Sequence, residues 1–129
     1  MSFNRWSSCA VLILSLLPCP AFPADAARQL AVDSMDFIGR MEAMLDGAIR
    51  SGSAADYDRF VFQPTLAQMN KWPPLSEASY LRYRRCQFAV DAFRNYADAS
   101  FKAGARIDGQ SIAAKDYAGQ KALCKQSVK

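Results

Sequence analysis

The stretch from Tyr80 to Phe88, YLRYRRCQF, holds the residues with the most chemical potential: three arginines and three aromatic side chains surround Cys86. Nearby positive charge lowers the pKa of a thiol and makes it a better nucleophile. A cysteine nucleophile also needs a base, which is normally histidine. The chain contains no histidine and no C-x-x-C pair. We therefore interpret Cys86 as a structural cysteine rather than a catalytic one.

The missing histidine excludes several other chemistries. It removes the Ser-His-Asp triad, the H-E-x-x-H zinc site and C-x-x-C-H haem attachment. A glycosidase needs two carboxylates across a cleft. Asp56 and Asp58 point about 200° apart on a helix, so they cannot share a site. Asp33 and Asp36 share a face, but Arg40 lies there too and the face is solvated. The sequence therefore predicts no enzyme activity, no cofactor and no metal site.

The N-terminal segment predicts export. A positively charged start, MSFNR, precedes the apolar run from Cys9 to Leu17 and a Pro/Ala-rich stretch, which is the order of a secretory signal. The run is about half the length that spans a bilayer. We expect a signal peptide over residues 1–26, cleaved after Ala21 or Ala26, and no transmembrane segment in the mature chain. Prolines on both sides of Cys19 disfavour lipid attachment. The expected location is the periplasm of a bacterium, or secretion.

Helical spacing dominates the rest of the chain, and residues 27–129 are expected to form one domain. Four helices are predicted, and short connections between them favour an antiparallel all-α bundle. The first spans about 26–50, the second starts at an N-cap Ser53, the third spans 76–103 with Ser76 as its cap, and the fourth spans about 110–125. Pro64 either kinks the second helix or begins a separate short one.

Two cysteines, Cys86 and Cys124, remain after export, and in an exported chain such a pair is most simply a disulfide. Cys86 lies 17 residues before the end of the third helix, and Cys124 lies 14 residues after the start of the fourth. Both distances correspond to roughly 20–25 Å of helix, so an antiparallel hairpin brings the sulfurs to the same end. Each cysteine also lies on the apolar side of its own helix. The sequence thus predicts one disulfide between the last two helices.

The same third helix carries a second apolar face. Leu81 and Phe88 lie two turns apart on it, about 180° from the core stripe, with Arg84 and Arg85 beside them. Two explanations stay open: the helix is central and buries both faces, or the apolar pair is exposed and ringed by arginine, as protein-binding hot spots are. We select these four residues, with Trp72 in the preceding turn, as the candidate partner-binding site.

Charge suggests what kind of partner is bound. Residues 73–129 carry ten Lys/Arg against five Asp/Glu, so this half could meet an acidic protein or an anionic surface. Arginine beside aromatic residues also resembles a base-stacking surface, but export disfavours nucleic acid.

The layout as a whole, with an export signal, a small helical domain and one late disulfide, resembles small periplasmic inhibitor or immunity proteins that block cell-wall-degrading toxins. We expect a non-enzymatic protein that binds another protein in the envelope. The alternative is an accessory or adaptor subunit of an envelope or secretion complex, which uses its basic half to bind an anionic surface. A weaker third hypothesis is a carrier of an apolar ligand in the bundle core, lined by Met41, Met44, Phe60 and Phe93.

Overall fold

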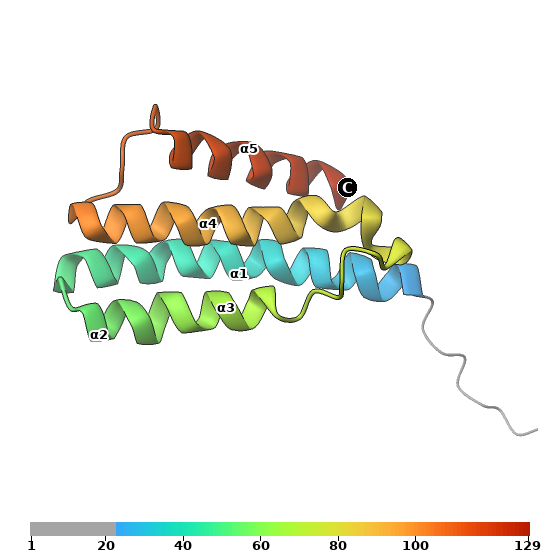
Figure 1. The fold of residues 1–129 in the computed structure, drawn as a ribbon, viewed down its shortest axis with the longest axis horizontal. Helices are drawn as coiled ribbons and strands as arrows, with labels where there is room; N and C mark the ends of the chain where they lie inside the picture. Colours follow the sequence, from blue (N-terminus) through green and yellow to red (C-terminus); the bar gives the residue numbers. More distant parts are fainter. Residues whose placement is uncertain (1–22) are drawn as a thin grey trace, which may run out of the picture.

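A computed structural model describes residues 23–129, and these form an antiparallel bundle of four helices without strands (Figure 1). The predicted all-α fold is confirmed. The predicted signal peptide, residues 1–26, falls mostly on residues 1–22, which lie outside the described part. The elements in chain order are α1 (Pro23–Ser51), α2 (Ala54–Tyr57), the π-helix η1 (Asp58–Phe62), α3 (Gln63–Met69), the 3-10 helix η2 (Ala78–Tyr83), α4 (Arg84–Ala103) and α5 (Ile112–Ser127).

The helix α1 buries one apolar stripe against the rest of the bundle. Phe37, Ile38 and Leu45 are among its buried side chains, as the 3.6-residue spacing predicts. Met44, which follows the same spacing, is instead 47% exposed. The helix ends at Gly52, whose φ of 65° needs a residue without a side chain.

The second helix continues through Pro64 by way of a π-helical turn. Ser53 caps it, since its hydroxyl accepts a hydrogen bond from the Asp56 amide at 3.2 Å. Proline has no amide hydrogen to bond the carbonyl four residues back. Just before it, the amide of Gln63 bonds the carbonyl of Asp58, five residues back. This i→i+5 pattern lets the helix continue through the proline, so α2, η1 and α3 follow one another without interruption.

The third helix starts differently from the prediction. Ser76 is not its cap: the N-cap is Glu77, and no side chain bonds the first amides. The next six residues form the 3-10 helix η2, and the α-helix begins only at Arg84. Short 3-10 turns are common at helix starts. Here Arg84 bonds back to the loop that precedes η2, which holds that loop close to the start of α4.

The predicted hairpin between the last two helices is confirmed. Cys86 of α4 and Cys124 of α5 form a disulfide with Cα atoms 4.5 Å apart, and both residues are fully buried. Ser111 caps α5 by accepting a hydrogen bond from the Ala114 amide at 3.3 Å. Further along, the Tyr117 ring stacks on Tyr96 with centroids 5.0 Å apart. The hairpin is therefore held by a covalent link near one end and by aromatic packing along its length.

The arrangement of the helices leaves a groove on one side of α5. In Figure 1, α1 and α4 lie side by side, the α2–α3 helix lies along α1, and α5 lies along α4. Since α5 packs mainly on α4, a groove remains between α5 and α1. Within residues 23–129, no helix is long and apolar enough to cross a membrane.

Candidate functional site

The second face of the α4 segment is exposed, which answers the question that the sequence left open. Leu81 is 63% exposed and Phe88 is 39% exposed, and Arg85 between them is also exposed. Large apolar side chains at this level of exposure are not core residues. The central-helix explanation, with both faces buried, is therefore excluded for this end of the helix.

Arg84 and Trp72 require a correction, because neither is at the surface. Arg84 is 5% exposed, and Trp72 is 7% exposed. The Arg84 guanidinium donates to the carbonyl of Pro73 at 2.8 Å and also to that of Pro74. The Trp72 ring packs edge-on against Tyr80 with centroids 6.1 Å apart. Both residues hold the loop before η2 in place, so we no longer include them in the candidate contact surface.

The two consecutive prolines are the sequence signal for this role of Arg84. Pro73 and Pro74 have no amide hydrogens of their own with which to build a regular turn, so the conformation of this loop depends on donors from elsewhere in the chain. An arginine carries five donors in a rigid fork and suits such a task. Arg84 also donates to the side chain of Gln87 at 2.8 Å.

Arg85 and Phe88 flank the disulfide-bonded cysteine of α4. Phe88 lies two residues after Cys86 and therefore about 200° around the helix from the side that is bonded to α5. We call Leu81, Arg85 and Phe88 the hairpin patch. It combines two exposed apolar side chains with a cation at the disulfide-linked start of α4.

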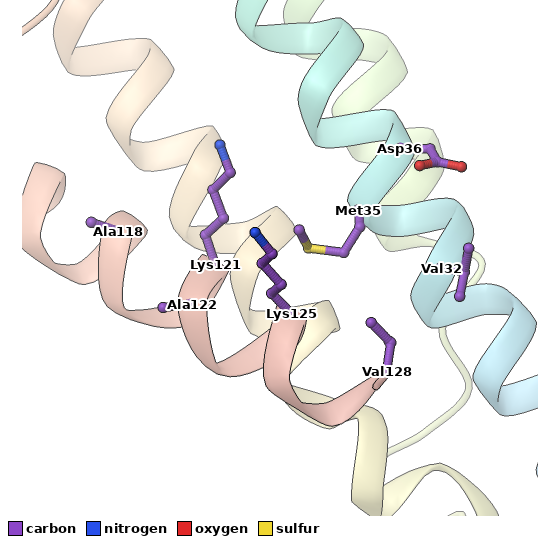
Figure 2. Close-up of a pocket in the computed structure, with 8 residues that line it drawn as sticks. All are labelled: Val32, Met35, Asp36, Ala118, Lys121, Ala122, Lys125 and Val128. Carbon is purple, nitrogen blue, oxygen red and sulfur yellow. The ribbon is translucent and has the colours of Figure 1, made fainter.

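A second feature, which the sequence did not indicate, is the groove between α1 and α5 (Figure 2). Its volume is about 540 Å³, and its lining is mostly apolar. The lining residues are Val32, Met35, Asp36, Ala118, Lys121, Ala122, Lys125 and Val128. The α1 residues flank the core stripe rather than belong to it, and the α5 stripe is weak, so periodicity gave no signal for this groove.

Polar bridges join α1 to α5 on either side of the α1 residues that line the groove, and each bridge uses one lining residue of the last helix, Lys121 or Val128. Glu42 accepts hydrogen bonds from the Tyr117 hydroxyl at 2.5 Å and from the Lys121 ammonium at 2.6 Å. On the other side, Arg28 donates to the carbonyl of Val128 at 2.9 Å. Local sequence patterns do not indicate this bridge, because the partners of Glu42 are more than 70 residues away along the chain.

The Glu42 bridge shifts the pKa values of Glu42 and Tyr117. Burial raises the pKa of Glu42, but the hydrogen bonds from Lys121 and Tyr117 and the nearby positive charges outweigh it, so the pKa is lowered. Burial and the bond to Glu42 raise the pKa of Tyr117. Next to it, the Arg106 guanidinium holds Asp46 by two bonds, at 2.7 and 2.9 Å, and lowers the pKa of that carboxyl. This network fixes α1 against the last hairpin.

The hypothesis of a core ligand site lined by Met41, Met44, Phe60 and Phe93 is not supported by where these side chains lie. Phe93 and Met41 are buried in the packed core, whereas Met44 and Phe60 are 47% and 45% exposed. They do not enclose a common cavity. Over residues 23–129 there is also no group of three or more His, Cys, Asp or Glu side chains placed to hold a metal ion.

The fold and these two surfaces define a class: a small, disulfide-linked all-α bundle with an exposed apolar and basic patch and a lateral groove. Comparison of the chain with protein families, with curated proteins and with solved structures finds no match.

Proposed function

We propose that this chain is an exported, non-enzymatic protein that acts by binding another protein in the bacterial envelope, as an inhibitor or immunity protein against a cell-wall-targeting toxin. The buried disulfide supports export, since such bonds persist mainly in oxidising compartments. The absence of histidine supports a binding role over catalysis.

The hairpin patch is the observation that carries the proposal. Protein interfaces are enriched in aromatic residues and arginine, and a few clustered side chains supply most of their affinity. Phe88, Leu81 and Arg85 have this composition. Arg85 and Phe88 lie on α4, which the disulfide links to α5, and Leu81 lies on η2 directly before it. A rigid surface loses little conformational entropy on binding, which favours tight inhibition.

The experiment captures partners from periplasmic extract with the wild-type chain and with Arg85→Glu and Phe88→Asp variants. Each variant should weaken a one-to-one complex at least about tenfold, as a hot-spot residue does. Arg40→Glu on exposed α1 is the matched control and should bind normally. Both substituted patch positions are solvent-accessible, so helix content by circular dichroism should be unchanged.

The captured partner must also lose its activity on cell wall when the wild-type chain is bound. Unchanged capture by both patch variants would show that the patch is not the interface. Capture of an assembly or secretion component, with no hydrolase inhibited, would instead support the adaptor hypothesis.

That adaptor hypothesis has one observation in its favour. In the described part of the chain, several cations of the basic half take part in no salt bridge: Arg82, Arg85, Lys115, Lys125 and Lys129. An anionic wall polymer or headgroup surface would interact with all of these cations together. Binding would then weaken gradually with salt and with each added charge change, and no single variant would abolish it.

A further inference from the structure

The groove between α1 and α5 has the properties of a small-molecule site. Its volume of about 540 Å³ lies within the usual range for ligand pockets, which are mainly apolar with a few placed polar groups. Five of its eight lining residues are Val, Met or Ala. The hairpin patch and the proposed partner play no part in this groove, so the inference is independent of the proposed function.

The groove has a limited length. The Glu42–Lys121 bridge and the Arg28–Val128 bond each join α1 to α5, one on each side of the Val32–Met35 lining. Fourteen residues of α1 separate the two bridges, which corresponds to about 20 Å. A partner helix is roughly 10 Å wide and normally lies along an open-ended groove. A finite slot between two bridges suits a single extended chain better.

The charges at the groove favour an anionic group. Figure 2 shows Lys125 reaching from α5 into the space opposite Met35, whereas the carboxylate of Asp36 points away from it. Lys121 is already paired with Glu42. Lys125 takes part in no salt bridge with any residue of the described chain. Lys125 is therefore the lining cation that takes part in no salt bridge of the described chain, and it lies next to the apolar residues of the groove.

We propose that this groove binds a single-chain amphiphile with an anionic head, of the long-chain carboxylate class. The head pairs with the Lys125 ammonium. The chain lies along Val32, Met35 and Val128 and removes their exposed apolar surface from water.

The test measures binding of octanoate, decanoate and dodecanoate to the purified, disulfide-intact protein by calorimetry, below micelle-forming concentrations. Two added methylenes should raise affinity about tenfold while the chain stays in the groove. Dodecyltrimethylammonium, with the same chain and a positive head, should bind more weakly than dodecanoate. Affinity that does not change with chain length would overturn the proposal.

Substitutions in and near the groove test whether the amphiphile binds there. Ala122→Trp fills the groove from an exposed position and should abolish binding. Lys125→Glu should lower the affinity for dodecanoate at least about fivefold and should raise the affinity for the cationic amphiphile. Lys115→Glu, on the same helix but outside the lining, is the control and should bind as wild type. Equal binding by Ala122→Trp and wild type, or binding only to phospholipid vesicles and not to free carboxylate, would refute the assignment.

Discussion

Removing the disulfide should cost this protein a large part of its stability. The perturbation is the double variant Cys86→Ala and Cys124→Ala. Alanine is preferred to serine because both positions are fully buried, where a hydroxyl group would need a hydrogen-bond partner. The substitution removes the covalent link without adding a polar group to the core.

The magnitude follows from the loop that the bond closes. The two cysteines are 38 residues apart, and the chain-entropy relation gives a stabilisation of about 4 kcal/mol for a loop of this length. Lost packing around the two buried sulfur atoms adds to this value. For a domain of about 100 residues, the corresponding fall in Tm is roughly 15–30 °C.

The assay is urea unfolding followed by circular dichroism, with and without reductant. Wild type should lose about 4 kcal/mol when reduced, and the double variant should not respond to reductant. The variant should unfold at a somewhat lower urea concentration than the reduced wild type, because it also lacks the two buried sulfur atoms. If the double variant were within about 1 kcal/mol of oxidised wild type, the entropic argument for the hairpin would be refuted.

Two further outcomes are expected from the buried polar contacts. Arg84→Met should destabilise the fold by about 1–3 kcal/mol in urea unfolding, because it removes the donors that hold the loop before η2, whereas the exposed neighbour Arg85→Met should stay within about 0.5 kcal/mol. The carboxyls of Glu42 and Asp46 have lowered pKa values, so their stabilisation is present above about pH 4.5 and lost as the pH falls through the folded-state values. Glu42→Gln should therefore flatten the acid limb of the stability–pH curve, and an unchanged limb would contradict the role of the network.

Local patterns were sufficient for the elements and much of the core. A 3.6-residue period places Cys86, Val90 and Phe93 on one face of α4, and all three are fully buried. The Ser53 cap was likewise predicted from its residue type and position. The start of α4 was not, since the loop that Arg84 holds is set by contacts ten and eleven residues away.

By itself, the sequence determined an all-α bundle, a disulfide between Cys86 and Cys124, and the absence of histidine chemistry, because each depends on spacing or composition alone. Only the tertiary structure decided that Arg84 and Trp72 are buried while Leu81 and Phe88 are exposed. It also decided where α5 leaves a groove along α1. Both outcomes depend on how the helices pack, and helical periodicity indicates which faces are apolar but not which neighbour, if any, covers them.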